Sequence, residues 1–211
     1  MQRDLFLRRV ASRLAQSPAT GDAAEPAAPV PATAVPGGPA ELLRLFVERF
    51  REAGGSADVV PTRSDVHAAV ARLLQDRQAA SAPGEPPLIA CPPSLVWDEI
   101  ADARTGDARR AAFGLTEADW GIAATGTLVL LHAGQRGRAC SLVPPAVGFL
   151  LPASRLVPHL GVVLRIVHES GVPPACVTFV SGPSHSADIA GQLVYGVHGP
   201  GEVHVWVIED E

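Results

Sequence analysis

Short apolar runs alternate with amphipathic stretches along the first half of the chain, and this alternation restricts the fold more than any other feature of the sequence. Residues 39–55 carry leucine and phenylalanine at helical spacing behind a proline, and residues 63–78 repeat the pattern with Ser64 as the expected N-cap. The residues at 57–61 predict a short strand, and the apolar run at 87–92 predicts a buried one. Because strands that alternate with helices form parallel sheets covered on both faces, these segments predict an α/β fold.

The second half of the chain is predicted to consist mainly of closely spaced strands. Apolar residues punctuated by glycine or proline occupy residues 120–134, 138–152, 176–184 and 201–210. A helix is expected over 154–170, opened by Ser154 with Pro158 in its first turn, and a short helix over 186–194. Together with the first half, these segments predict one α/β domain whose sheet is buried on both faces.

The N-terminal part of the chain differs in composition from the rest. Residues 1–16 are arginine-rich and amphipathic, which predicts a surface helix, and residues 17–40 hold six prolines, which predicts an extended linker. The α/β domain is therefore expected over residues 41–211. The sequence has no apolar run long enough to span a membrane, and its scattered cysteines favour a reducing, cytoplasmic location.

Composition excludes several kinds of chemistry. All 17 basic residues are arginine, which rules out Schiff-base catalysis and the lysine of a phosphate-binding P-loop. The net charge is −5 and the sequence shows no basic patch, which argues against a nucleic-acid partner. Cys91, Cys140 and Cys176 lie far apart, and the histidines lack metal-ligand spacing. We therefore expect neither an iron–sulfur cluster nor a metal site in this chain.

The segment SGPSHSADIA, residues 181–190, has the composition of a binding loop. It follows an apolar run and places its polar side chains where a helix is expected to begin near Ser186. A catalytic triad of Ser184, His185 and Asp188 is disfavoured, because such close neighbours point in different directions. Two interpretations stay open. The serines and free backbone N–H groups form an anion cradle at the carboxyl end of a strand, or they only cap a helix.

The segment GVHGP, residues 196–200, adds a second candidate. His198 stands between two glycines, so it is expected in a loop where it can bind a ligand or move a proton. Gly199 would let the backbone approach a ligand closely. The alternative is a tight turn into the last strand.

The segment ATGT, residues 124–127, is the third candidate. Gly126 inside a strand-like pattern suggests a close approach of the backbone or a bulge, and Thr125 and Thr127 would share one face of an extended chain. The alternative is a turn between two strands.

Taken together and in this order, the three segments resemble the LUD domain family, and within it proteins of the lactate utilization protein C type. Those proteins carry similar ETGT, GPSRTADIE and GVHGP sequences, where this chain has ATGT at 124–127, GPSHSADIA at 182–190 and GVHGP at 196–200. The resemblance extends over about residues 40–210. It implies a three-layer α/β/α sandwich similar to ribose-5-phosphate isomerase and CoA transferases.

The resemblance also implies a function. It points to a subunit of an L-lactate oxidation system that forms pyruvate, with iron–sulfur clusters in partner proteins and a small carboxylate as ligand. Asp188 and His198 are then the candidate catalytic residues. The candidate ligand-binding residues are Thr125, Gly126, Thr127, Gly182, Ser184, His185, Ser186 and Gly199.

Two departures from the family pattern bear on the ligand. The glutamate of ETGT is Ala124 here, and the arginine after GPS is His185. If that arginine grips a carboxylate with two hydrogen bonds, histidine is a weaker and pH-dependent replacement.

Two other functions remain open from the sequence. One is a free-standing enzyme acting on a sugar phosphate or an acyl-CoA, which rests on analogy of fold alone. The other is a non-catalytic carboxylate-binding or regulatory module.

Overall fold

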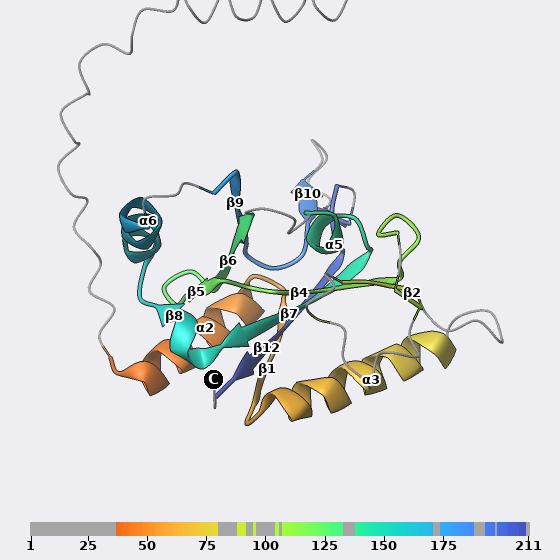
Figure 1. Cartoon of the computed structure of the whole chain (residues 1–211), viewed down its shortest axis with the longest axis horizontal. Coiled ribbons are helices and arrows are strands. Elements are labelled where there is room, and N and C mark those ends of the chain that lie inside the picture. The colour runs from red at the N-terminus through yellow and green to blue at the C-terminus, as the bar shows by residue number, and fades with distance from the viewer. Residues whose placement is uncertain are drawn as a thin grey trace, which may run out of the picture. The chain divides into compact units, whose positions relative to one another are not determined.

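The computed structural model describes residues 37–79, 88–91, 95, 104–105, 107–132, 138–170, 174–187, 193–196 and 198–209. Its largest element is a six-stranded sheet in the order β1-β12-β7-β4-β2-β3, in which every pairing is parallel (Figure 1). In that order the strands are Ser56–Val60, Glu202–Ile208, Ala146–Pro152, Phe113–Glu117, Leu88–Ala90 and Arg104–Thr105. The predicted α/β fold with a parallel sheet is confirmed.

Helices α2, Pro39–Glu52, and α3, Arg63–Ala79, cover opposite faces of this sheet. Strand β12 shows the reason, because successive side chains of a strand point to opposite faces. Its Val205 packs with Phe46 and Phe50 of α2, whereas Trp206 packs on the α3 side with Val66 and Val70. Both faces of the strand are therefore buried, as expected for a parallel sheet.

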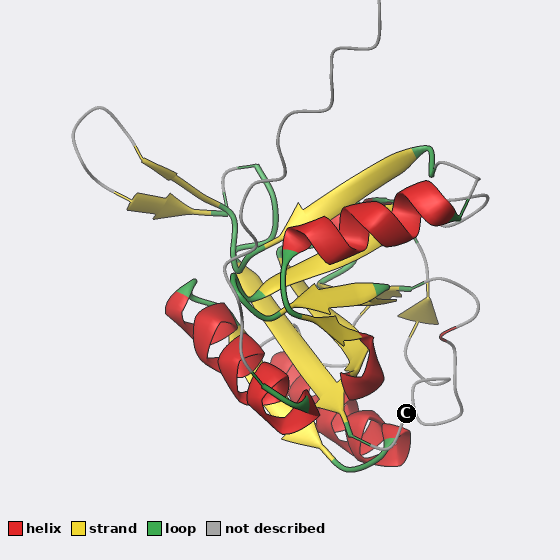
Figure 2. Ribbon diagram, turned by 90° about the vertical axis from the view of Figure 1, so that its left-hand side faces the viewer, coloured by secondary structure: helices red, strands yellow, loops and turns green. Residues whose placement is uncertain are grey.

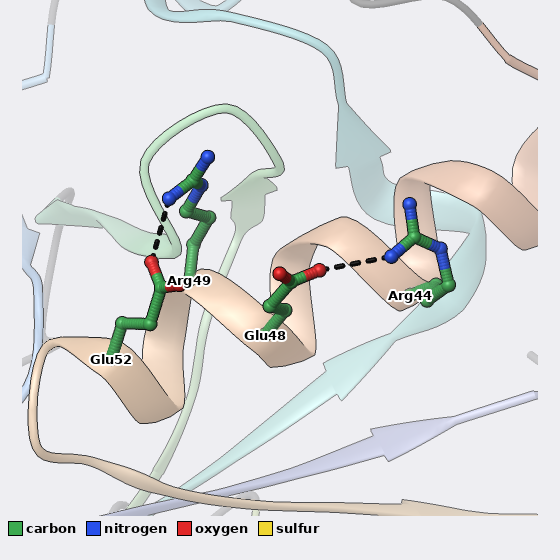
Figure 3. Close-up of polar contacts among 4 residues, drawn as sticks. All are labelled: Arg44, Glu48, Arg49 and Glu52. Atoms are coloured by element: carbon green, nitrogen blue, oxygen red, sulfur yellow. Dashed lines mark hydrogen bonds and ion pairs between the residues drawn. The ribbon is translucent and has the colours of Figure 1, made fainter.

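The outer face of α2 is polar. Arg44 pairs with Glu48 at 2.9 Å and Arg49 with Glu52 at 2.6 Å, one helical turn apart in each case (Figure 3). All four side chains are about half exposed or more, so these pairs add little to stability. The apolar face of the helix points to the core, where Phe46, Val47 and Phe50 are buried.

A second, smaller sheet lies in the order β8-β5-β6-β9. Its strands are Leu156–Val157, Trp120–Ile122, Thr127–His132 and Cys176–Val180. One of its faces joins the α2 core through Leu128 and Leu130, and the other packs through Val129 against helix α6, Leu160–Glu169. The sequence predicted β5, β6 and β9 but placed them in a single sheet with the others, and it predicted helix at the position of β8.

Two helix starts differ from the prediction. Thr62, not Ser64, caps α3. Its backbone N–H donates to Asp65 Oδ2 at 3.0 Å, and its Oγ1 donates to the same oxygen at 2.7 Å. Helix α6 begins at Leu160 rather than Ser154, behind the 3-10 turn η2, Ala153–Arg155, and strand β8. Proline disfavours helical backbone in the residue before it, so Pro158 holds Val157 extended.

The predicted helix over 186–194 is wrong in the part that the structure describes. Strand β10, His185–Ala187, pairs with β11, Leu193–Tyr195, as an antiparallel hairpin that Figure 2 shows standing apart from the two sheets. The ladder between these strands replaces the free N–H groups that a helix start would have offered to an anion. Asp188 lies outside the described residues.

The other expectations concern the N-terminal region and membrane spans. The predicted helix at 1–16 and nearly all of the predicted linker at 17–40 lie outside the described residues. None of the helices that the structure describes is long and apolar enough to cross a membrane.

Candidate functional site

Hydroxyl groups connect the first and second motif segments. Thr127 Oγ1 lies 2.6 Å from Thr125 Oγ1 and 2.8 Å from Ser181 Oγ. Thr127 is only 6% exposed and begins β6, whereas Ser181 follows the last residue of β9. Because β6 and β9 pair directly, this bond ties together the ends of two neighbouring strands.

Two motif glycines pack against the C-terminal end of α2. Gly126 has φ of +59°, and a Cβ built on it would lie 2.2 Å from the backbone nitrogen of Phe50. Gly182 has φ of +83°, and its Cβ would lie 2.3 Å from the carbonyl oxygen of Ala53. Only glycine tolerates both the positive φ and the close approach, so these residues anchor the two loops on the helix.

Backbone hydrogen bonds join the second and third motif segments. The N–H of Ser184 donates to the carbonyl oxygen of Pro200, and the N–H of Gly196 donates to the carbonyl oxygen of Ser184, both at 2.8 Å. Gly201 in turn donates to Pro145, just before β7. The loops at 181–184 and 196–201 are therefore one connected structure.

These joined loops form one wall of a pocket of about 340 Å³. Motif residues that line it are Ser181, Gly182, Pro183, Ser184, His185, His198, Gly199 and Pro200. Further lining residues come from β9 and from the short helix α5, Ala139–Leu142. His198 is exposed, and His185 Nδ1 lies 3.0 Å from the carbonyl oxygen of Pro183. The structure thus brings two of the three segments to one pocket, which we call the motif pocket.

The motif pocket lies at the amino ends of parallel strands β7 and β12, because Pro145 and Gly201 directly precede them. The sequence had suggested the carboxyl ends. Ser181 does follow the carboxyl end of β9, but that strand belongs to the smaller antiparallel sheet. The order of segments along the chain could not reveal which sheet each strand would join.

The remaining predicted residues divide into two groups. Thr125, Gly126 and Thr127 are not among the described residues that line the motif pocket, and their observed contacts hold a turn against α2 and β9. The alternative of a strand-to-strand turn is therefore confirmed for residues 123–126, which connect β5 to β6. Ser186 pairs with Val194 in the hairpin.

The structure adds lining residues that the sequence did not single out. Ser141 of α5 and Thr178 of β9 both face the motif pocket. Thr178 Oγ1 lies 3.0 Å from Nε2 of His132, a side chain that is 6% exposed. In the sequence, Thr178 stands out only as a polar residue in an otherwise apolar strand, and this pattern is too common to identify a site residue. Within the described residues, no three metal-ligating side chains gather in one place.

His204 lies near the amino end of β12, on the face of the large sheet that α3 covers. It lines a smaller hollow of about 200 Å³, and its Nε2 is 3.0 Å from Asp58 Oδ2. The centre of its ring lies 4.3 Å from that of Trp206, with the two ring planes tilted by 34°. Burial lowers the pKa of His204, although the Asp58 carboxylate beside it favours the charged form.

This lowered pKa predicts a pH-dependent stability. The unfolded chain takes up a proton at His204 more readily than the folded chain, so the stabilisation present above the ordinary histidine pKa is lost as pH falls, from about 7 to 5. Urea unfolding across this range should show a smaller loss for His204→Gln than for the unaltered chain. The exposed His168, changed to Gln, serves as control. Equal pH slopes in all three proteins would contradict the assignment to His204.

The loops that line the motif pocket lie within the part of the chain that matches a known family. The LUD domain model matches residues 94–208. Lactate utilization protein C of Halalkalibacterium halodurans is 42% identical over 120 residues, 54% of this chain and 52% of that protein. Lactate utilization protein C 1 of Bacillus mycoides is 41% identical over 108 residues, 49% of this chain and 46% of that protein. The chain thus aligns with about half the length of these curated relatives.

A solved structure supports the fold. The crystal structure of a DUF162 family protein from Deinococcus radiodurans superposes with a TM-score of 0.59 at 22% identity, and covers 82% of this chain and 99% of that chain. At this identity the likeness concerns the fold alone. Since the LUD domain model matches more than half of the residues, the chain belongs to the LUD domain family.

Proposed function

We propose that the chain is a subunit of an L-lactate utilization system, in which it contributes a domain without iron–sulfur clusters that binds a small carboxylate. The observation that carries the proposal is the joining of the loops at 181–184 and 196–201 around the motif pocket, in a chain similar to proteins named for lactate utilization. Electron transfer through clusters is assigned to partner proteins, because this chain has only three, widely spaced cysteines.

The motif pocket has groups suited to a small carboxylate with a neighbouring hydroxyl. The Ser184 hydroxyl can donate to a carboxylate oxygen, and His198 can accept a proton from the ligand or return one. His185 stands at the position of the arginine in the GPSRTADIE sequence that this segment resembles, and its ring lines the motif pocket, where it can donate a hydrogen bond to a carboxylate. Asp188 belongs to the same proposal as a proton-transfer candidate, on the segment between β10 and β11.

Reconstitution tests this role. The chain is co-expressed with its candidate iron–sulfur partner proteins, and lactate-dependent dye reduction is followed with and without it. We expect activity to require the chain, and to fall about 10-fold or more in His198→Gln, as for loss of a general acid or base. Ser184→Ala should chiefly raise the KM for lactate, because it removes one hydrogen bond to the ligand.

The outcomes separate the open alternatives. His168→Gln changes an exposed histidine on α6 and should leave the activity unchanged. Full activity without the chain would contradict the lactate role. Turnover of lactate by the isolated chain would contradict the role as a dependent subunit.

A further inference from the structure

A buried histidine is connected to the motif pocket through a threonine. His132 is the last residue of β6 and Thr178 lies in the middle of β9, and these two strands run side by side (Figure 1). Because His132 pairs with Cys176, two residues before Thr178, both side chains lie on the same face of the sheet. Thr178 Oγ1 lies 3.0 Å from His132 Nε2. Thr178 lines the motif pocket, whereas His132 is not among its described lining residues.

The surroundings of the His132 ring favour a hydrogen on Nε2. The side chain is 6% exposed, and its Nδ1 is buried with no hydrogen-bond partner in the part of the chain that the structure describes. A hydrogen on Nδ1 would therefore be a buried donor without an acceptor, an arrangement that proteins avoid. A hydrogen on Nε2 instead has Thr178 Oγ1 as its acceptor. The ring then donates to the threonine and keeps Nδ1 as an acceptor.

This direction of the bond leaves the Thr178 hydroxyl hydrogen available. A hydroxyl has one hydrogen to donate and two lone pairs that accept, and His132 takes one of the lone pairs. The other side-chain group that reaches Thr178 Oγ1, among the described residues, is the Cys176 thiol at 4.0 Å, and sulfur is a weak acceptor. That thiol donates to the carbonyl oxygen of Val177 at 3.7 Å. The hydroxyl hydrogen of Thr178 can therefore turn toward a ligand in the motif pocket.

Two other hydroxyls that line the motif pocket are already engaged. Ser141 Oγ donates to the carbonyl oxygen of Arg138 at 3.1 Å, and Ser181 Oγ lies 2.8 Å from Thr127 Oγ1. Thr178 is also stiffer than a serine, because its branched Cβ restricts rotation about χ1. A fixed donor of this kind favours an oxygen acceptor on the ligand over an apolar group, which would leave the hydroxyl unpaired once water is excluded.

We propose that Thr178 contacts the ligand of the motif pocket as a hydrogen-bond donor, and that His132 is the positioning residue that directs its hydroxyl toward the pocket. This inference rests on the proposed function, because it concerns the same pocket and the same ligand. It adds two residues from outside the three motif segments. The His132 ring acts on the ligand only through the hydroxyl of Thr178.

Nitrogen-15 NMR of the full chain with labelled histidine tests the role of His132. Long-range correlation spectra between ring nitrogens and ring hydrogens give the tautomer of each histidine, and His132→Gln identifies the signals of this one. We expect the hydrogen on Nε2, and Thr178→Val should shift the Nε2 signal because it removes the acceptor. A hydrogen found on Nδ1 would overturn the proposal.

Lactate-dependent dye reduction in the reconstituted system tests the contact with the ligand. Thr178→Val keeps the shape of the side chain without its hydroxyl, so kcat/KM should fall about 10-fold, the effect of about one hydrogen bond. Thr178→Ser, which keeps the hydroxyl, should retain most of the activity. His132→Leu should also lower kcat/KM, and His132→Gln, whose amide can still donate, should lower it less. Thr116→Val changes a buried threonine on β4, outside the described lining of the motif pocket, and is the matched control.

The outcomes distinguish this inference from the proposed function. If Thr178→Val has the kcat/KM of the unaltered chain while His198→Gln loses activity, the inference is overturned and the proposed function stands. Equal impairment of Thr178→Ser and Thr178→Val would show that the hydroxyl is not the cause, and would also overturn it. Full activity without the chain would overturn both.

A double variant tests the order in which the two residues act. Adding His132→Leu to Thr178→Val should lower kcat/KM little further, because the ring acts through the hydroxyl that is already absent. Two losses that multiply in full would contradict the positioning role of His132. Far-ultraviolet circular dichroism of each variant separates loss of the contact from loss of the fold.

Discussion

Replacing Gly126 with alanine should destabilise the folded chain by about 2–5 kcal/mol, because a strained backbone and an overpacked contact add together. Its φ of +59° is unfavourable for any side chain, and the new Cβ would lie 2.2 Å from the Phe50 nitrogen. That atom belongs to the α2 backbone and cannot move aside cheaply. Chemical denaturation gives the change directly, as a lower midpoint with an unchanged m-value.

Gly161→Ala is the matched control for this substitution. Gly161 lies in the first turn of α6, where the nearest atom to a new Cβ is Nδ1 of the His159 ring at 3.1 Å. A helical glycine replaced by alanine commonly gains about 0.5–1 kcal/mol, so this variant should match or exceed the stability of the unaltered chain. If Gly126→Ala is as stable as Gly161→Ala, the packing of the turn on α2 is wrong.

Trp206→Ala should destabilise the chain by about 3–5 kcal/mol, the range for removing a large buried aromatic side chain. Trp206 is 1% exposed, packs in the core on the α3 side, and contacts the ring of His204. Such a loss is a large part of the total stability of an ordinary domain, about 5–15 kcal/mol. Thermal unfolding followed by circular dichroism should show a large drop in Tm.

Two further variants make this prediction specific. Leu164 on α6 is 55% exposed, so Leu164→Ala should change the free energy of unfolding by less than about 1 kcal/mol. Gly148 on β7 faces the indole, since a Cβ there would lie 2.5 Å from Trp206 Cζ3. Gly148→Ala should therefore destabilise the chain. A milder effect of Trp206→Ala than of Leu164→Ala would contradict the observed core.

The sequence by itself determined the class of fold and the existence of the loops. Apolar periodicity is a local property, so the helices α2 and α3 and the strands β1, β7 and β12 follow from short windows of residues. Glycine and proline mark loops by their backbone preferences, which indicated the turn at 181–184 and left a turn at 123–126 as one of two alternatives. These features depend on neighbours in the chain and not on distant partners.

Local signals failed where a distant partner decided the outcome. Residues 186–194 have helical composition, yet β10 and β11 pair with each other. Residues 154–157 lie in a turn and a strand because β8 pairs with β5, through Gly121 with Leu156 and Ile122 with Val157. Backbone pairing of this kind overrides weak helix preferences.

Only the tertiary structure decided which residues share a site. The Thr127–Ser181 contact joins residues that are 54 positions apart, and the Arg63–Glu117 pair links a helix start to the end of a distant strand. The sequence shows residue types and their spacing, whereas a site depends on which strand ends meet. That meeting is set by sheet order and by the direction of each strand. Both depend on the packing of the whole core, so no short segment contains them.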